Sequence, residues 1–492
     1  MALIQLSNLT FSYEGAHTPV FEDLTLSLDT SWRLGLVGRN GRGKTTLLKL
    51  LCKTLVGSGS VNAPGHFMYF PHEPQNRNLC AREVAREACP DCEDWQLLRE
   101  INLLALSPDV LDRPFRTLSN GERTKLLLAT LFLQEDNFPL IDEPTNHLDS
   151  HGREVVGRYL RSKPGFILVS HDRAFLDGCI DHILAFEKTG PELQIGNFSS
   201  WWLNKQQKDA YELAENNRLK KEVRRLSGAA RRTTGWSDAV EKTKYQSRNA
   251  GLRPDRGFIG HKSAKMMKRA KSIEARRLQA AEEKSTLLRN LEEAQPLKLS
   301  PLPFSGGPLA TLKDVCIQYG NVTVCQGIDL TVFSGDRIAL RGNNGSGKSS
   351  LLKLLAGEPL SHTGDVQRSQ RAQISCVEQD ASQLLGGLSD YAAQRQIDRT
   401  LFYSILRKLD FPRRQFEQDL STYSAGQKKK VLLAASLCTP AHLYLWDEPL
   451  NYVDVFSRMQ LEELLLEFHP TIVFVEHDDL FCRSVATKTL SL

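Results

Sequence analysis

The sequence lacks the features that would place this protein in a membrane or outside a cell. No run of about 20 apolar residues occurs in it, so no transmembrane helix is expected. The start, Met1 to Tyr13, has neither the basic residues nor the apolar stretch of a secretory signal. Ten cysteines are scattered without a disulfide framework, which suits a reducing cytoplasm. Cys89 and Cys92 have C-x-x-C spacing, but no second pair accompanies them, so a metal is not expected there.

Net charge is small on average but unevenly distributed. The whole chain of 492 residues carries +5. Residues 201–300 contain 24 Lys or Arg against 12 Asp or Glu, a net of +12, so the rest of the chain carries −7. A basic insert between two acidic halves indicates a polyanionic partner, and the alternative is a solvated helical surface.

The two halves of the chain repeat the same motifs at an offset of 304 to 306 residues. The constant offset predicts a tandem duplication, with domains at residues 1–200 and 301–492 and a linker at 201–300. The repeated pairs are the glycine loops from Gly38 and Gly342, LSNGE from Leu118 and YSAGQ from Tyr423, Asp-Glu-Pro from Asp142 and Asp447, His-Asp from His171 and His477, and Tyr13 with Tyr319.

Each copy alternates apolar strands with helices. Residues 32–37 and 336–341 indicate strands that enter the glycine loops, and 46–51 and 350–355 indicate the helices that leave them. The apolar runs 139–142, 165–170, 442–447 and 471–476 have the length of buried strands. This alternation of strands and helices predicts two α/β domains with mainly parallel sheets.

Both glycine loops match G-x-x-x-x-G-K-[ST], a phosphate-binding motif. The glycines let backbone N–H groups turn toward a phosphate, the lysine neutralises its charge, and the hydroxyl of Thr45 or Ser349 binds Mg²⁺. The residues predicted to bind nucleotide here are Gly38, Arg39, Asn40, Gly41, Arg42, Gly43, Lys44, Thr45 and Thr46, and Gly342, Asn343, Asn344, Gly345, Ser346, Gly347, Lys348, Ser349 and Ser350.

Carboxylates end one apolar strand in each copy. Asp142 and Asp447 stand where a carboxylate can bind Mg²⁺, and the adjacent Glu143 and Glu448 can polarise the attacking water as general bases. The alternative is a solvated turn, which the phosphate loop upstream disfavours.

One histidine follows the next apolar strand in each copy. A lone histidine is usually structural, but His171 and His477 occupy the same place in the repeat. We therefore expect both to meet the terminal phosphate of the nucleotide and to take part in catalysis.

Together these motifs resemble the nucleotide-binding domains of ABC ATPases. Two such domains with a charged linker and no membrane domain resemble the ABC-F class, which acts on ribosomes. The resemblance implies a monomer whose two domains form a head-to-tail sandwich, with each ATP between the glycine loop of one domain and the signature motif of the other. It implies that Ser119 and Gly121 complete the second site, that Ser424 and Gly426 complete the first, and that Tyr13 and Tyr319 stack on adenine.

The glutamine loop of this family, which supplies a Mg²⁺ contact, is well matched only in the second copy, at Gln379. In the first copy His72 or Gln75 could take its place, or the contact could be lost. DEPTNHLD in the first copy also becomes DEPLNYVD in the second, so unequal turnover at the two sites is expected.

The linker is expected to form an antiparallel helical hairpin. Residues 201–230 and 261–294 mix charged and apolar residues at helical spacing without proline, and the tip near 231–261 is irregular. Its basic residues can bind phosphates and its aromatics can stack on unpaired bases, while the alternative is a disordered, merely solvating loop. The residues predicted to bind RNA are Arg231, Arg232, Lys242, Lys244, Tyr245, Arg248, Arg253, Arg256, Phe258, Lys262, Lys265, Lys268 and Arg269.

Residues 255–271, DRGFIGHKSAKMMKRAK, closely resemble the tip of the Lsa branch of antibiotic-resistance ABC-F proteins. LSNLTFSYEG, GRNGRGKTT, SAGQKKKVL and LYLWDEPLN carry the same resemblance. It implies protection of the ribosome from lincosamides, streptogramin A and pleuromutilins. The ATP-bound protein would enter the tRNA exit site beside the peptidyl-tRNA, and hydrolysis would drive its release. Phe258 is implied to lie nearest the drug, acting by contact or through rRNA.

Three other functions stay open at this point. The first is a housekeeping ABC-F translation factor at the same ribosomal site. The second is the ATPase subunit of a drug exporter, which would need a partner that spans the membrane. The third is a DNA-associated ATPase whose basic linker binds duplex.

Overall fold

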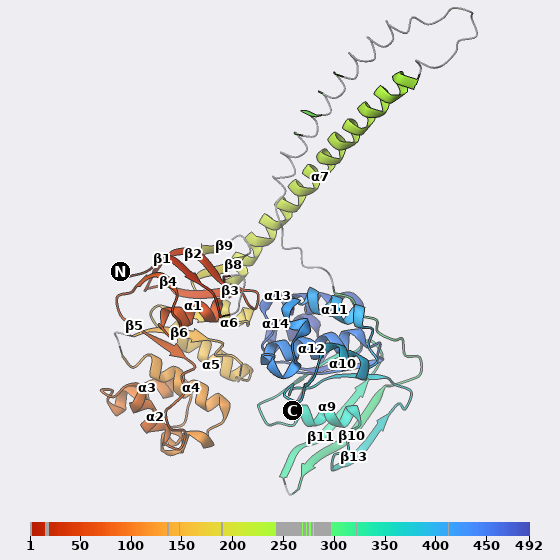
Figure 1. Ribbon diagram of the computed structural model, residues 1–492. Helices are drawn as coiled ribbons and strands as arrows, with labels where there is room; N and C mark the ends of the chain where they lie inside the picture. Colours follow the sequence, from red (N-terminus) through yellow and green to blue (C-terminus); the bar gives the residue numbers. More distant parts are fainter. Residues whose placement is uncertain are drawn as a thin grey trace, which may run out of the picture. The chain divides into compact units, whose positions relative to one another are not determined.

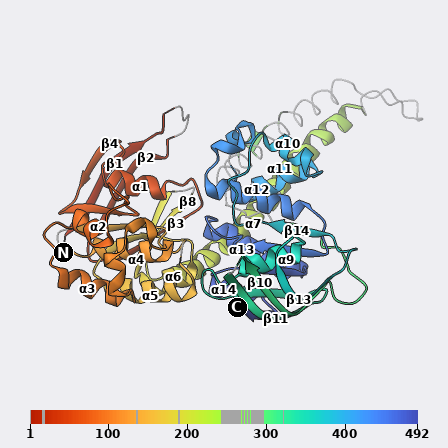
Figure 2. The same cartoon turned by 90° about the horizontal axis from the view of Figure 1, so that it is seen from below.

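The computed structural model describes residues 2–14, 19–134, 137–146, 148–187, 190–242, 297–320, 322–411 and 413–492, and five positions between 268 and 279. The chain divides into two compact units, Met1–Trp201 with Ala294–Leu492, and Trp202–Glu293. The first unit holds two cassettes of similar construction, which we call the first cassette (residues 2–201) and the second cassette (residues 297–492) (Figures 1 and 2).

The first cassette contains two sheets. The larger has the order β5-β6-β7-β3-β8-β9, parallel except for β9, and the smaller is antiparallel with the order β2-β1-β4. Leucines from both sheets and from α1 share one core, including Leu6, Leu36 and Leu47. The strands are β1 (Leu3–Phe11), β2 (Phe21–Asp29), β3 (Arg33–Gly38), β4 (Ser58–Asn62), β5 (His66–Phe70), β6 (Asn137–Asp142), β7 (Phe166–Val169), β8 (His182–Glu187) and β9 (Gly190–Ile195).

The helices of the first cassette fall into two groups. α1 (Lys44–Leu51), α5 (Ser150–Arg161) and α6 (Arg173–Cys179) accompany the strands. α2 (Ala81–Ala88), α3 (Asp94–Leu103) and α4 (Asn120–Leu131) gather at the end of the cassette opposite to the β2-β1-β4 sheet (Figure 1). α4 begins at the LSNGE motif, so this helical part carries the first signature.

The second cassette repeats this plan. Its larger sheet is wholly parallel with the order β14-β15-β16-β12-β17, and its smaller sheet is antiparallel with the order β11-β10-β13. The strands are β10 (Ala310–Tyr319), β11 (Val322–Val332), β12 (Arg337–Arg341), β13 (His362–Arg368), β14 (Ile374–Val377), β15 (Leu443–Asp447), β16 (Ile472–Val475) and β17 (Lys488–Ser491). The helices are α9 (Lys348–Ala356), α10 (Leu388–Gln394), α11 (Arg399–Lys408), α12 (Ala425–Cys438), α13 (Val455–Phe468) and α14 (Asp479–Val485).

The predicted α/β class with mainly parallel sheets is confirmed. The apolar runs form strands because each is buried on both faces: every residue of β7, β15 and β16 is buried. Parallel strands end at one edge of their sheet, so the glycine loops, the Asp-Glu pairs and the histidines, each of which follows a strand, meet at that edge.

One long helix, α7 (Phe198–Lys242), forms most of the described part of the linker. The irregular tip was expected to begin at Arg231, and this expectation needs correction because the helix continues to Lys242. Gly235 weakens a helix, but propensities of about 1 kcal/mol per residue are weak priors, and the next proline is Pro254. Within the described ranges, no helix combines the length and the apolar character that crossing a bilayer requires.

The residues predicted to bind RNA are only partly described. Arg231, Arg232 and Lys242 belong to α7, and Lys268 is exposed in a helical conformation. The others lie outside the described residues: Lys244, Tyr245, Arg248, Arg253, Arg256, Phe258, Lys262, Lys265 and Arg269.

Candidate functional site

Each glycine loop joins a strand to a helix through backbone conformations that favour glycine. Gly41 and Gly43 have φ of 82° and 89°, and Gly345 and Gly347 repeat this with 83° and 93°. A Cβ at Gly43 would lie 2.6 Å from the ring of Phe21, so a side chain does not fit there. α1 and α9 begin directly after these loops, and their first backbone N–H groups are free to meet an anion.

The lysine of each loop folds back onto its own loop. Lys44 Nζ donates to the carbonyls of Gly38 at 2.7 Å and Arg39 at 3.2 Å. Lys348 Nζ donates to Gly342 at 2.9 Å and Asn343 at 2.7 Å. Burial lowers the pKa of both lysines, and neighbouring carboxylates oppose that shift. Each ammonium therefore lies buried at the centre of a loop, where a phosphate oxygen would be a stronger acceptor than a carbonyl.

The carboxylate that ends β6 faces the hydroxyl of the first loop. Thr45 Oγ1 donates to Asp142 Oδ2 at 2.7 Å, and the Tyr69 hydroxyl donates to the same oxygen at 2.9 Å. Burial raises the pKa of Asp142, and these two hydrogen bonds lower it. In the second cassette, burial likewise raises the pKa of Asp447, opposed by the hydroxyl of Ser349. Asp447 Oδ1 is buried without a hydrogen-bond partner among the described residues, so a hydroxyl and an unsatisfied carboxylate oxygen fit a Mg²⁺ ion, which prefers oxygen ligands.

The glutamate after each of these strands is held in an uncommon backbone conformation. Glu143 has φ of 51° and Glu448 has φ of 46°. Their N–H groups donate to the ends of the neighbouring strands, at 2.9 Å to Val169 and 3.0 Å to Val475. Non-glycine residues adopt such φ values mainly where surrounding contacts enforce them, often at functional sites. The turn directs each glutamate out of its strand and toward the histidine of the same cassette.

The glutamates and histidines predicted to be catalytic lie close together in both cassettes. His171 Nε2 lies 3.3 Å from Glu143 Oε1, and His477 Nε2 lies 3.7 Å from Glu448 Oε1. All four side chains are largely buried. Burial, followed by the ammonium of Lys44, lowers the pKa of His171, so this imidazole is neutral at pH 7.

The two glutamates differ in their ionisation. Burial, followed by the charge of Asp142, raises the pKa of Glu143 to about 8. Burial acts on Glu448 in the same direction, but hydrogen bonds from His477 and Gln379 outweigh it and lower its pKa. Asn451 Nδ2 also donates to Glu448 Oε2 at 2.6 Å. At neutral pH Glu143 is therefore mostly protonated, whereas Glu448 is ionised.

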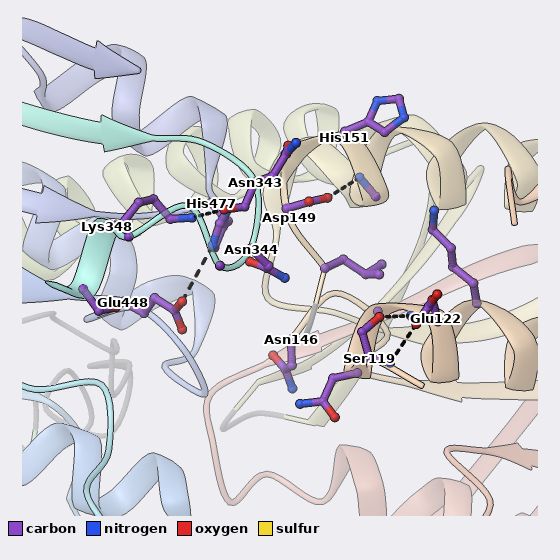
Figure 3. Close-up of a pocket in the computed structure, with 18 of the residues that line it drawn as sticks. Ser119, Glu122, Asn146, Asp149, His151, Asn343, Asn344, Lys348, Glu448 and His477 are labelled. Carbon is purple, nitrogen blue, oxygen red and sulfur yellow. Dashed lines mark hydrogen bonds and ion pairs between the residues drawn. The ribbon is translucent and has the colours of Figure 1, made fainter. Parts of the chain in front are cut away.

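A cavity of about 920 Å³ lies between the second glycine loop and the first signature (Figure 3). Lys348, Glu448 and His477 line one side, and Ser119 with Gly121 lines the other. Ser119 caps α4, and its Oγ accepts from the N–H of Glu122 at 3.2 Å. The volume is at the upper end of the range for small-molecule sites, so the cavity can hold a nucleotide.

The first glycine loop has a smaller cavity beside it, of about 500 Å³. Thr45, Asp142 and Glu143 line it, together with Tyr452 of the second cassette. Asn40 Nδ2 donates to the carbonyl of Tyr452 at 3.1 Å, so the loop is in contact with the second cassette.

The second signature does not reach this cavity. Ser424 caps α12 as Ser119 caps α4, and a Cβ at Gly426 would lie 2.7 Å from the carbonyl of Tyr452. Ser424 and Gly426 are not among the described residues that line the cavity. The first signature thus lines a cavity with the second loop, whereas the second signature and the first loop both contact the carbonyl of Tyr452.

The two tyrosines predicted to stack on adenine lie beside the loops. The Tyr13 hydroxyl is 2.9 Å from Thr46 Oγ1, and the Tyr319 hydroxyl is 3.2 Å from Ser350 Oγ. Their exposed fractions are 46% and 47%, so about half of each ring remains open to a ligand.

The glutamine-loop positions also differ between the cassettes. Gln379 lines the larger cavity. In the first cassette His72, and not Gln75, lines the smaller cavity with Asp142 and Glu143. Both ring nitrogens of His72 are buried without a hydrogen-bond partner in the described part of the chain, and burial lowers its pKa. The geometry favours His72 over Gln75 at this position.

The sequence reasoning missed a set of buried charges near the sites. Lys430 Nζ donates to Asp454 Oδ2 at 3.0 Å, and Lys429 Nζ donates to the carbonyl of Asp447 at 2.8 Å. On α5, Arg153 pairs with Asp172 at 2.8 Å. The sequence did contain a signal for these buried charges. Three lysines, Lys428–Lys430, precede a largely apolar stretch of the same helix, so a lysine there must be buried or paired.

Comparison with known proteins gives consistent similarities. Residues 21–146 and 325–451 each match the protein family described as ABC transporter. The ATP-binding protein Uup of Caulobacter vibrioides is 28% identical over 493 residues, which cover 96% of this chain and 75% of Uup. The ribosome protection protein VmlR of Bacillus subtilis is 28% identical over 502 residues, covering 99% and 86%. A crystal structure containing the archaeal ribosome recycling factor aABCE1 is similar with a TM-score of 0.64 at 20% identity, covering 98% and 87%, which shows the shared fold.

Proposed function

This chain belongs to the ABC transporter family, in which it is an ATPase with two ATP-binding domains, and on that premise we propose that it acts on the ribosome. Specifically, we propose an ABC-F protein of the Lsa type that binds the ribosome with ATP and protects it from antibiotics. The observation that carries this proposal is the similarity to a ribosome protection protein over 99% of the chain, basic linker included. The ten cysteines, all free, suit a cytoplasmic location.

The proposed chemistry is ATP hydrolysis by residues of this chain. Glu448 accepts the proton of the attacking water, and His477 orients the terminal phosphate beside it. Lys348 neutralises phosphate charge, while Ser119 and Gly121 of the opposite cassette complete the shell around the phosphate. Lys44, Glu143 and His171 have the same roles in the first site, which Ser424 and Gly426 would complete when the cassettes close further.

Mg²⁺ would be held by residues at the strand ends. Thr45 and Asp142 suit this role in the first site, and Ser349, Gln379 and Asp447 suit it in the second. When bound, the ion neutralises charge that develops on the β- and γ-phosphate oxygens. In the first site His72 takes the position of the glutamine.

Unequal turnover follows from the ionisation of the glutamates. A general base must be deprotonated to act, and Glu448 is ionised at neutral pH whereas Glu143 is not. We propose that in this arrangement the second site hydrolyses ATP more readily. The first site then acts mainly as a clamp that keeps the cassettes together.

The basic linker is the proposed contact with ribosomal RNA. Arg231, Arg232 and Lys242 belong to α7 and are proposed to bind RNA phosphates, and Phe258 is proposed to act nearest the drug. In this proposal the linker enters the tRNA exit site beside the peptidyl-tRNA. The drugs displaced are lincosamides, streptogramin A and pleuromutilins.

Expression in a susceptible bacterial host tests the resistance function. We expect the inhibitory concentrations of lincomycin, a streptogramin A and a pleuromutilin to rise several-fold. Matched controls are Lys44→Met with Lys348→Met, which removes phosphate neutralisation, and Phe258→Ala, which removes the proposed apolar contact. Both should lower the resistance.

Two results would contradict the resistance proposal in different ways. No rise in resistance together with ATP-dependent ribosome binding would favour a housekeeping translation factor. Fractionation of the protein with membranes rather than ribosomes would favour an exporter subunit.

A further inference from the structure

A lysine ammonium lies inside the second cassette where two parallel strands end. Lys429, in the second turn of α12, is only 3% exposed. Its Nζ donates to the carbonyl of Glu378 at 2.7 Å and to that of Asp447 at 2.8 Å, with the carbonyl of Gln379 at 3.5 Å. The ammonium therefore links three elements: the glutamine loop after β14, the end of β15, and the signature helix.

Acidic side chains surround this ammonium. Burial lowers the pKa of Lys429, and Asp447, Glu476, Glu448 and Glu378 oppose that shift. Glu476 is itself buried, and its carboxylate accepts from the N–H groups of Leu450 at 2.6 Å and His477 at 3.1 Å. A buried charge persists where partners and hydrogen bonds compensate it, and both conditions hold here.

The first cassette has no counterpart of this arrangement. The repeat offset aligns Thr124 with Lys429 and Ser170 with Glu476, so neutral residues replace both charges. In the first cassette, Ser170 Oγ lies 3.3 Å from Thr145 Oγ1. At the corresponding place in the second cassette, Glu476 accepts a hydrogen bond from the backbone N–H of Leu450. Thr124 lines the 500 Å³ cavity with Asp142 and Glu143, and no side chain fills that space in the described part of the chain.

We propose that Lys429 is a positioning residue of the second ATP site. Its ammonium holds the Gln379 loop against the strand end that carries Asp447 and Glu448, and so fixes the metal-facing carboxylate and the general base. The inference rests on the role of Glu448 as the general base proposed above. Displacement of a catalytic group by about 1 Å can cost up to about a hundredfold in rate, so a buried three-carbonyl contact can govern turnover without touching substrate.

Helix α12 also connects the contacts of Lys429 with the first ATP site. Ser424, which caps the N-terminus of α12, is the signature residue proposed to complete the first site, whereas Lys429, the fifth residue of the helix, contacts the second site. A shift of α12 when ATP binds at the first site would therefore move the glutamine loop of the second. This connection exists in one cassette only, because Thr124 has no ammonium.

The test measures turnover at the second site alone. In a Glu143→Gln background, Lys429→Met keeps the apolar stem and removes the ammonium. We expect kcat to fall about tenfold to a hundredfold with little change in KM, because the base is displaced while ATP binding is not. Lys428→Met, at the half-buried neighbouring position, is the matched control and should leave kcat unchanged.

The separation of kcat from KM distinguishes positioning from simple loss of structure. A misfolded second cassette would lose ATP binding and raise KM, whereas a displaced general base lowers kcat alone. Lys429→Arg keeps a cation that can donate to the carbonyls of Glu378 and Asp447, and it should restore much of kcat.

Because Lys429→Met removes one cation near buried Glu476, which Arg458 and Arg153 also face, a second variant guards against misfolding. Lys429→Thr with Glu476→Ser recreates the neutral pair of the first cassette. We expect its thermal stability to return to that of the parent while kcat stays low. Recovery of kcat together with stability would overturn the proposal, as would an unchanged kcat in Lys429→Met.

The role of Glu448 is checked separately. If Glu143→Gln with Glu448→Gln hydrolyses ATP as fast as Glu143→Gln alone, the assignment of the general base fails. The Lys429 variants then report on a different base, so the two failures are distinguishable.

Discussion

At the scale of single residues, the two ATP sites differ most in their general bases. Glu143 and Glu448 follow equivalent strands with nearly equal φ, yet their neighbours differ. Glu143 has two oxygens without a well-formed hydrogen bond among the described residues, whereas Glu448 accepts from Asn451. An unsatisfied buried carboxylate favours its neutral form, and a hydrogen-bonded one favours its charged form.

This difference predicts that the rate of ATP hydrolysis depends on pH differently at the two sites. With Glu448→Gln only the first site turns over, and its rate should rise as pH increases through about 8, the pKa of Glu143. With Glu143→Gln only the second site turns over, and its rate should be flat above neutral pH because Glu448 is already ionised. Steady-state phosphate release across this pH range measures both, and coincident profiles would refute the difference.

Residue types and spacing predicted much of the site, but not its ionisation. The repeat located the lysines, carboxylates and histidines, because those motifs recur in the same order at one offset. The choice between His72 and Gln75 needed the structure, since it depends on which side chain the loop turns inward. Lys429 was missed because its role comes from two distant strand ends that only folding brings to it.

At the scale of secondary-structure elements, the strands and the linker helix were predictable, but the residue at which that helix ends was not. Apolar runs such as 471–476, which follows Pro470, have the length of buried strands. α7 continues past Gly235, although glycine weakens a helix. The buried faces of helices near the sites also carry charges that no periodicity reveals, such as Arg153 on α5.

Two arginines on α5 allow the contribution of a buried ion pair to stability to be compared with that of an exposed one. Arg153 pairs with buried Asp172, whereas Arg158 pairs with exposed Glu154 on the same helix. Arg153→Met should lower the free energy of unfolding by about 3–5 kcal/mol, because it leaves a buried carboxylate without its partner. Arg158→Met should change it by less than about 1 kcal/mol. Denaturant unfolding followed by tryptophan fluorescence measures both, and equal effects would show that burial of the pair contributes nothing.

At the scale of the whole molecule, one chain carries two ATP-binding cassettes and a basic linker. The constant offset of the motifs made the duplication predictable, since five pairs share it. The size of the 920 Å³ cavity was not predictable, because it depends on how the second loop and the first signature meet. The central claim is that ATP binding, with hydrolysis blocked, holds this chain on ribosomes.

Co-sedimentation of the purified Glu143→Gln, Glu448→Gln variant with ribosomes tests that claim most directly. With ATP and Mg²⁺ we expect the variant to sediment with ribosomes, because the closed cassettes cannot reopen by hydrolysis. With ADP, or with Lys44→Met and Lys348→Met added, it should stay in the supernatant. Sedimentation independent of nucleotide, or no sedimentation with ATP, would contradict the account.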